Sequence, residues 1–204
     1  MSLSEKLIKI HQGLDAHRDD EVVKSYIEYL LNWIGEDPHR EGLRDTPTRV
    51  VKAFKEYFGG YGLSPSDILD KTFEDVSGYS SPILVRNIDF VSHCEHHLAP
   101  IVGVVHVSYI PNGRVVGLSK IPRIVDMFAH RLQLQERMTT DIAQTLQDNL
   151  NPEGVAVMIE ATHFCLKARG VKKSQSDIQT MHYTGIYTQD HDLQKDFIQS
   201  CLKS

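Results

Sequence analysis

Two long runs of mostly β-branched residues constrain the fold of this chain more than any other feature of its sequence. The first, IVGVVHVSYI at 101–110, ends at a turn-forming Pro-Asn-Gly, and the second, VAVMIEA, spans 155–161. Runs of this length and composition are typical of buried strands. Two stretches with helical periodicity, 118–131 and 133–150, lie between them. A sheet that is interrupted by helices and then resumed indicates the α+β class.

The remaining elements extend this pattern toward both ends of the chain. Helices are predicted at 21–34, from Thr46 and Pro47 to the glycines at 59–60, and at 192–202, with a short one at 3–11. Strands are predicted at 83–91, at 115–116 and around 181–187, with a loop over 60–81. The order is then two helices, two strands, two helices, two strands and a helix, which favours mainly antiparallel pairing.

Composition excludes several classes of protein. The 204 residues include 11 histidines but only 3 cysteines, too few for a disulfide-built secreted scaffold, so we expect a cytoplasmic location. A net charge of -5 argues against a general nucleic-acid binder, whose affinity depends on surplus Lys and Arg. No stretch approaches the roughly 20 apolar residues of a membrane helix, so we expect no membrane partner.

The segment HCEHH at 93–97 is the first candidate for chemistry, because a Cys and a His three residues apart can bind one zinc ion. The motif alone is a weak signal, and a surface loop with incidental histidines is the alternative. Cys165 strengthens the metal hypothesis, although a lone Cys is more often a small buried hydrophobe. Cys94, one of the paired histidines and Cys165 would leave a fourth position for water, as in catalytic zinc sites.

His163 lies two residues before Cys165, at the end of the second apolar run. On an extended chain, residues at this spacing point to the same face. If Cys165 binds a metal, we expect His163 beside it, available for acid–base chemistry near neutral pH.

Three groups of polar residues could bind an anion. They are Arg49 and Lys52 on the second helix, Ser119, Lys120 and Arg123 at the start of a later helix, and Lys167 and Arg169 after Cys165. A helix N-terminus favours anions, and a triphosphate would suit four or five such groups. For each group alone, a solvated surface face is the more common explanation.

Gln135 and Glu136 lie near the start of the helix predicted at 133–150. A carboxylate there could accept two N–H bonds from a guanine-like edge. Spacing alone favours the simpler explanation, a Glu stabilised by the helix dipole.

Five segments occur in an order that resembles the GTP cyclohydrolase I family. They are GLRDTPTRV at 42–50, CEHHLAP at 94–100, GLSKIPRIV at 117–125, RLQLQERMT at 131–139 and ATHFCLKARGVKK at 161–173. The resemblance covers about residue 20 to the C-terminus. It implies an N-terminal helical region over 1–60 and a catalytic domain over 61–204 with the tunnelling fold, assembled as a toroidal homodecamer of two pentamers.

The resemblance also implies a function: conversion of GTP and water to 7,8-dihydroneopterin triphosphate and formate, the entry step of folate and pterin synthesis. It assigns zinc binding to Cys94, His97 and Cys165, acid–base work at guanine N7 to His163, and a place near the ribose to His96. Guanine binding is implied for Gln135 and Glu136, and a substrate contact for Ser119. Triphosphate binding is implied for Lys120, Arg123 and Arg169, and Arg49 and Lys52 match cations supplied across a subunit interface.

Two departures from the family pattern keep other functions open. The stretch SQSDIQTMHYTG at 174–185 has Ile178, Met181 and His182 where hydroxyls are common, which motivates a paralogue acting on another purine or pteridine. His93 stands where smaller or apolar residues are more familiar. It could be a spectator, or a fourth ligand in a structural zinc protein.

Overall fold

The computed structural model describes residues 19–73 and 78–202, so the short helix expected at 3–11 lies outside the described residues. The chain separates into two compact units, residues 1–56 and 57–204. Within the described ranges, no helix is both long and apolar enough to cross a membrane.

The first unit contains two helices, α2 (Asp20–Trp33) and α3 (Thr46–Tyr57), which the sequence predicts at these places. Asp19 caps α2, since its carboxylate accepts a hydrogen bond of 2.9 Å from the Glu21 amide. An ion pair of 2.6 Å joins Lys55 of α3 to Asp20 of α2. Both ionic side chains are largely exposed, so the pair orients the helices more than it stabilises them.

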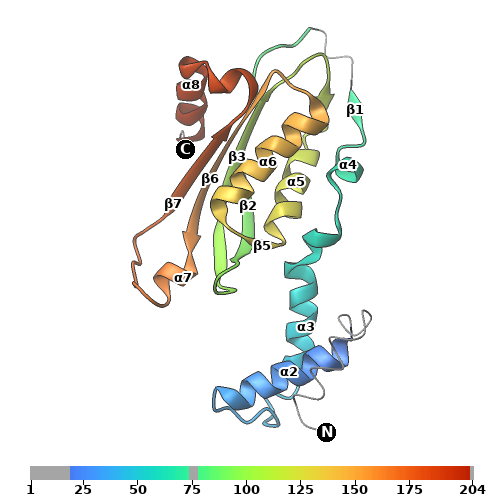
Figure 1. Cartoon of the computed structure of the whole chain (residues 1–204), viewed down its shortest axis with the longest axis vertical. Coiled ribbons are helices and arrows are strands. Elements are labelled where there is room, and N and C mark those ends of the chain that lie inside the picture. The colour runs from blue at the N-terminus through green and yellow to red at the C-terminus, as the bar shows by residue number, and fades with distance from the viewer. Residues whose placement is uncertain (1–18, 74–77, 203–204) are drawn as a thin grey trace. The chain divides into compact units, whose positions relative to one another are not determined.

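A five-stranded sheet forms the centre of the second unit, in the order β5-β2-β3-β6-β7 (Figure 1). The strands are β2 (Ile83–Cys94), β3 (Pro100–Ile110), β5 (Leu132–Gln133), β6 (Gly154–His163) and β7 (Ile178–Tyr183). A two-stranded ribbon pairs β1 (Thr72–Phe73) with β4 (Val115–Val116). Pairing is antiparallel throughout except between β2 and β5, which confirms the expected α+β tunnelling fold with its antiparallel sheet and N-terminal helices.

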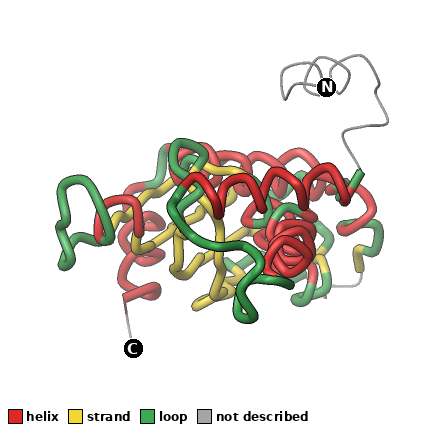
Figure 2. The backbone as a smooth tube through the Cα atoms, turned by 90° about the horizontal axis from the view of Figure 1, so that it is seen from below, coloured by secondary structure: helices red, strands yellow, loops and turns green. Residues whose placement is uncertain are grey.

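Two helices, α5 (Lys120–Ala129) and α6 (Gln135–Leu150), cover one face of the sheet (Figure 1), and the strands form a single layer beside helices (Figure 2). Alternate residues of β3 and β6 point to this face. Val105, Val107, Val157 and Ile159 are fully buried there together with Ile142 of α6. The opposite face of the sheet is partly covered as well. Because both faces of the central strands are buried, their sequences are mostly apolar along the whole strand and do not alternate.

The opposite face packs against α8 (His191–Leu202) near β6 and β7. Met158, Phe197 and Cys201 form a second apolar cluster there. His106 lies on this face and is 1% exposed, and neither of its ring nitrogens has a hydrogen-bond partner in the described part of the chain. Burial lowers the pKa of His106, and the positive charge of Arg86 lowers it further. A carboxylate oxygen of Glu160 lies 3.6 Å from His106 Nε2 and raises the pKa, which opposes the effect of burial.

Because the pKa of His106 is depressed in the folded protein, the unfolded chain binds more protons just below pH 6.5. Stability should then fall as the pH drops below this value, at up to about 1.4 kcal/mol per pH unit for one proton. We predict that His106→Leu reduces this slope and leaves stability at pH 8 equal or higher. Urea unfolding midpoints between pH 5 and 8 measure both effects, and an unchanged slope would contradict the assignment.

Part of the loop expected at 60–81 is regular secondary structure. A 3-10 turn, η2 (Gly59–Gly62), and a short helix, α4 (Pro65–Ile68), precede β1. The turn is tied to the end of α5, since Gly60 N–H donates to His130 O at 3.0 Å and Arg131 donates twice to Gly60 O. The turn-forming residues of 60–81 predict only a loop, because the hydrogen-bond partners of Gly60, which are His130 and Arg131, lie about 70 residues later in the sequence.

Gly60 is required by this close approach: a Cβ on it would lie 2.2 Å from the Met127 carbonyl oxygen. We predict that Gly60→Ala destabilises the protein by at least about 1–3 kcal/mol, the cost of overpacking a site that cannot give way. Gly59→Ala is the matched control, since a Cβ there meets nothing within 4 Å. Equal denaturant midpoints for the two variants would show that the backbone contact is unimportant.

Element boundaries differ from the sequence expectations in three places. Strand β2 continues past residue 91 to Cys94, because β5 pairs with its last two residues. The last strand ends at Tyr183 rather than near 187, and a 3-10 turn, η3 (Gly185–Thr188), follows. An unexpected helix, α7 (Phe164–Lys167), follows β6 directly.

Candidate metal centre and adjoining pocket

A tight turn at the end of β2 brings His97 back onto Cys94. The Cys94 amide donates to Ala99 O and Cys94 O accepts from the Leu98 amide, each at 2.9 Å. Leu98 takes the left-handed conformation with φ of 54°. The turn leaves the His97 Nδ1 atom 3.8 Å from the Cys94 sulfur, while Cys94 itself is buried.

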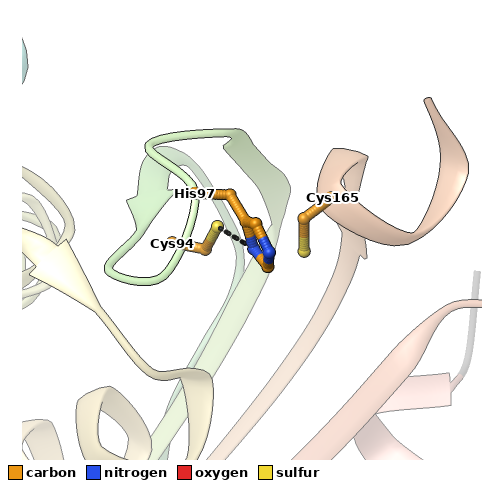
Figure 3. A group of neighbouring side chains, drawn as sticks. All are labelled: Cys94, His97 and Cys165. Atoms are coloured by element: carbon orange, nitrogen blue, oxygen red, sulfur yellow. Dashed lines mark hydrogen bonds between the residues drawn. The ribbon is translucent and has the colours of Figure 1, made fainter. Parts of the chain in front are cut away.

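Cys165 completes a three-residue group from the other side (Figure 3). It lies in α7, directly after β6, and one possible ligand atom from each of Cys94, His97 and Cys165 lies within 4.8 Å of the others. The expectation that His163 and Cys165 share a face of an extended chain is wrong, because the chain turns into a helix at Phe164. The helical turn still directs the Cys165 sulfur toward Cys94.

The chemistry of these three side chains fits a metal ion. Two thiols and one imidazole suit a borderline-soft cation such as zinc. Burial raises the pKa of the Cys165 thiol, and the neighbouring Cys94 raises it further. Such a pair of thiols gains most from a shared cation that favours both thiolates. The structure therefore shows a group that could hold a metal ion.

His93 does not belong to this group. Its ring packs against the rings of Tyr57 and Phe58, with centroid distances of 4.6 and 5.4 Å, and only 8% of the residue is exposed. Successive side chains of a strand point to opposite faces, so His93 points away from the Cys94 sulfur. Within residues 19–73 and 78–202, no fourth His, Cys, Asp or Glu joins the three ligands.

A cavity of about 310 Å³ adjoins the three candidate ligands. Its wall is formed by Cys94, His96, His97, Gln133, Leu134, Gln135, Glu136, His163, Cys165, Leu166 and Ile178. Of the residues singled out in the sequence, the structure therefore brings together the metal candidates, both further histidines and the Gln-Glu pair. Antiparallel pairing of β3 with both β2 and β6 is the cause, since it sets Cys94 and His163 at the same end of the sheet.

His163 and Glu136 are electrostatically coupled in this cavity. Burial lowers the pKa of His163, and the negative charge of Glu136 opposes that shift. Glu136 is exposed at the first turn of α6, where the helix dipole favours its carboxylate. The His163 imidazole and the Glu136 carboxylate thus line the same cavity.

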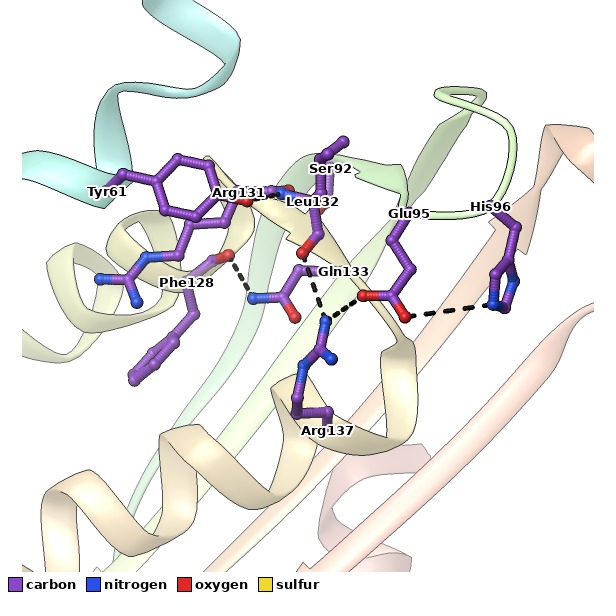
Figure 4. A network of polar contacts seen from close by, with 9 residues as sticks. All are labelled: Tyr61, Ser92, Glu95, His96, Phe128, Arg131, Leu132, Gln133 and Arg137. Atoms are coloured by element: carbon purple, nitrogen blue, oxygen red, sulfur yellow. Dashed lines mark hydrogen bonds and ion pairs between the residues drawn. The ribbon is translucent and has the colours of Figure 1, made fainter. Parts of the chain in front are cut away.

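A polar network holds the turn that carries His96 (Figure 4). Arg137 of α6 forms an ion pair with Glu95, whose other oxygen lies 4.0 Å from His96 Nε2. The Glu95 amide also donates to Gln133 O at 3.1 Å. These contacts fasten the turn to α6 and β5, although His96 itself remains largely exposed.

The expected phosphate ligands are absent from the described wall of this cavity. Ser119, Lys120 and Arg123 lie at the N-terminal end of α5, whose other end leads into β5 beside Cys94. Ten helical residues span about 15 Å, so these side chains are far from the metal group in the same chain. Lys120 instead pairs with Asp70 at 3.0 Å.

The other cations are also outside the cavity wall. Arg169 is exposed after α7, and Lys167 pairs with Asp177 at 3.1 Å. Arg49 and Lys52 are exposed residues of α3 in the first unit, where Arg49 pairs with Asp45 at 3.2 Å.

Three wall residues were not singled out in the sequence. Leu134 and Leu166 are ordinary apolar residues, and Gln133 lies in a two-residue strand, whereas Ile178 was noted only as a departure from the family pattern. Gln133 donates to Phe128 O at 2.8 Å, while its side-chain oxygen is buried without a partner among the described residues. Only the pairing of β5 with β2 places it beside Cys94.

An α+β domain with two thiols and an imidazole gathered beside a cavity that further histidines and a glutamate line has the features of a metal-binding enzyme. Comparison with known proteins narrows this class. The family model for GTP cyclohydrolase I matches residues 23–202, so the chain belongs to the GTP cyclohydrolase I family and the resemblance seen in its motifs is confirmed.

Curated relatives agree with the family assignment. GTP cyclohydrolase 1 of Sinorhizobium fredii (strain NBRC 101917 / NGR234) is 55% identical over 161 residues, which cover 79% of this chain and 78% of the relative. That of Allorhizobium ampelinum (strain ATCC BAA-846 / DSM 112012 / S4) is 54% identical over 170 residues, 83% and 85% of the two chains. That of Brucella canis (strain ATCC 23365 / NCTC 10854 / RM-666) is 54% identical over 172 residues, 84% and 81%.

Two solved structures were also matched. An archaeosine synthase QueF-Like in the apo form is 19% identical with a TM-score of 0.41, over 52% of this chain and 94% of the other. A dihydroneopterin aldolase from Burkholderia thailendensis bound to guanine is 14% identical with a TM-score of 0.36, over 52% and 91%.

Proposed function

We propose that this protein is a zinc-dependent GTP cyclohydrolase I, which converts GTP and water to 7,8-dihydroneopterin triphosphate and formate at the entry to folate and pterin synthesis. The observation that carries the proposal is the group of Cys94, His97 and Cys165 at the wall of a cavity that also holds His163 and Glu136. Relatives at 54–55% identity that bear this enzyme's name support it.

Three protein ligands suit a catalytic ion better than a structural one, because catalytic zinc keeps one position open. Bound zinc would supply a water activated at neutral pH. A structural site would need a fourth protein ligand. The sequence offered His93 for that place, and its packing against Tyr57 and Phe58 removes it.

The residues of the chain divide the remaining work. His163 would exchange a proton with N7 of the purine as the bond to C8 is hydrolysed, since its imidazole lines the cavity and burial lowers its pKa. The Glu136 carboxylate would accept hydrogen bonds from the guanine ring N–H and exocyclic amine. His96 would lie near the ribose, held through Glu95 and Arg137.

The triphosphate site needs a second copy of the chain. Ser119 and Lys120 lie at the end of α5 away from β5 and Cys94, about 15 Å along the helix. Neither Lys120 nor Arg123 belongs to the described cavity wall of its own chain. We propose that neighbouring subunits of a toroidal decamer of two pentamers bring these cations, with Arg49, Lys52 and Arg169, to each cavity.

Further expectations belong to the same proposal. Residues 61–204 would form the catalytic domain, and residues 1–60 would form a helical region that supplies Arg49 and Lys52. The low cysteine content suits an enzyme of the cytoplasm.

An assay with GTP tests the proposed function. Purified protein with zinc should release formate and, after oxidation, yield fluorescent neopterin in equal amounts. Tight GTP binding without formate would overturn the proposal in favour of a paralogue that acts on another purine or pteridine. Cobalt substitution gives an independent check, since a spectrum without exchangeable water would indicate a closed, structural site.

A further inference from the structure

Gln135, the first residue of α6, is only 2% exposed, and its side-chain amide is fully engaged within the protein. The Nε2 atom lies 3.1 Å from Ile159 O, 3.1 Å from Ile178 O and 3.0 Å from Thr180 Oγ1. The Oε1 atom lies 2.7 Å from His163 Nε2. Elements β6, β7 and α6 thus meet at this one amide.

The orientation of the Gln135 amide follows from its partners. Two of the atoms around Nε2 are backbone carbonyl oxygens, which can only accept hydrogen bonds. The opposite orientation would set the side-chain oxygen against both of them and leave buried polar groups unpaired, at about 1–3 kcal/mol each. The amide nitrogen therefore faces β6 and β7, and the oxygen faces His163.

This orientation fixes the proton on the imidazole. An amide oxygen only accepts hydrogen bonds, so the His163 Nε2 atom at 2.7 Å must donate. A neutral imidazole carries one N–H. The other nitrogen, Nδ1, then holds a lone pair, and it has no hydrogen-bond partner among the residues that the structure describes.

We propose that Gln135 is a positioning residue, whose Oε1 atom holds the Nε2–H of His163 and so leaves Nδ1 as the ring nitrogen available to the purine. The inference rests on the proposed function. It differs from the guanine contact that the family resemblance implied for Gln135, because an amide with all of its groups engaged has little left to offer a substrate.

Two buried or partly buried hydroxyls reinforce the arrangement. Thr139 Oγ1 donates to Gln135 O at 2.7 Å and lies 2.7 Å from Thr180 Oγ1. Each hydroxyl has one proton, so Thr180 donates to Thr139 and accepts from the Gln135 amide. The hydrogen bonds then run in one direction around a closed circuit, which makes rotation of the amide costly.

The tautomer can be measured directly on the full oligomeric protein. Histidine labelled with ¹⁵N distinguishes protonated from unprotonated ring nitrogens by chemical shift, and the His163 signals are those missing in His163→Gln. In the unmodified protein at pH 8.5, we expect a protonated Nε2 and an unprotonated Nδ1. The reverse pattern would overturn the proposal, whatever the enzyme's activity.

Kinetics of Gln135→Met separates positioning from substrate binding. Methionine has a similar length but cannot accept the hydrogen bond from His163. We expect kcat to fall by about 10–100-fold, as for other residues that orient a functional histidine, while the KM for GTP changes by less than about threefold. A higher KM with unchanged kcat would instead establish a direct guanine contact.

Two further variants keep the test decisive. Thr180→Val removes one acceptor but leaves both carbonyls that orient the amide, so the His163 tautomer should stay unchanged. Gln135→Glu sets an oxygen against the Ile159 and Ile178 carbonyl oxygens, so it should not restore the kcat lost in Gln135→Met. If the unmodified protein releases no formate from GTP, the proposed function fails, whereas the ¹⁵N measurement still decides the role of Gln135.

Discussion

Replacing Cys94 with serine should leave the protein folded but nearly inactive and without stoichiometric zinc. Cys94 is the candidate ligand at the end of β2, and its sulfur is one of only two in the described group. Formate release should fall by more than about 10³-fold, because zinc is what lowers the pKa of water from about 15.7 to about 7. Zinc content by mass spectrometry and formate release from GTP measure the two effects together.

Cys201→Ser is the matched control for this experiment. Cys201 is also buried, but it is a residue of α8 and packs in the second apolar cluster with Met158 and Phe197. Burial raises the pKa of its thiol to about 11. This variant should keep one zinc per chain and most of the activity. If Cys94→Ser retains zinc and rate, or if both cysteine variants lose them equally, the assigned metal centre is wrong.

Replacing His163 with alanine should abolish most of the activity while zinc remains bound. The imidazole lines the cavity and is the group expected to exchange a proton with the purine, a contribution of about 10²–10⁴-fold. The three candidate metal ligands are not altered, so zinc content should match that of the unmodified protein. Single-turnover formate release, measured beside zinc content, separates the loss of proton transfer from the loss of metal.

His93→Leu provides the comparison within the same histidine-rich segment. His93 packs against Tyr57 and Phe58, and its buried Nδ1 atom has no hydrogen-bond partner within residues 19–73 and 78–202. An apolar side chain therefore removes no polar contact through that atom, and zinc content and rate should change little. Loss of zinc in His93→Leu, or full activity in His163→Ala, would contradict the roles proposed for these two histidines.

The sequence was a good guide to the elements that bury apolar residues with regular spacing. The runs at 101–110 and 155–161 became β3 and β6, because β-branched residues suit a sheet covered on both faces. The helices α2, α3, α6 and α8 also lie close to their predicted places. Short elements such as α7 and β5 escaped prediction, since four or two residues carry no periodic signal.

The candidate site was less accessible to the sequence than the fold. Spacing alone leaves open which of His96 and His97 joins Cys94, and the family resemblance implies His97. In the structure, the turn through Leu98 brings the His97 ring to the Cys94 sulfur. Spacing also suggested that His93 could be a ligand. Its packing excludes this, because neighbouring residues of a strand face opposite sides.

The sequence by itself determined the α+β class, the family and the identity of the candidate ligands, because these depend on local periodicity and on ordered motifs that can be read along the chain. The tertiary structure decided which atoms meet. It turned the Gln135 amide toward two carbonyl oxygens and His163, and it set Lys120 at the far end of α5. Such partners come from segments far apart in sequence, so the pairing of strands and the packing of α6 determine them, and no pattern along the chain records them.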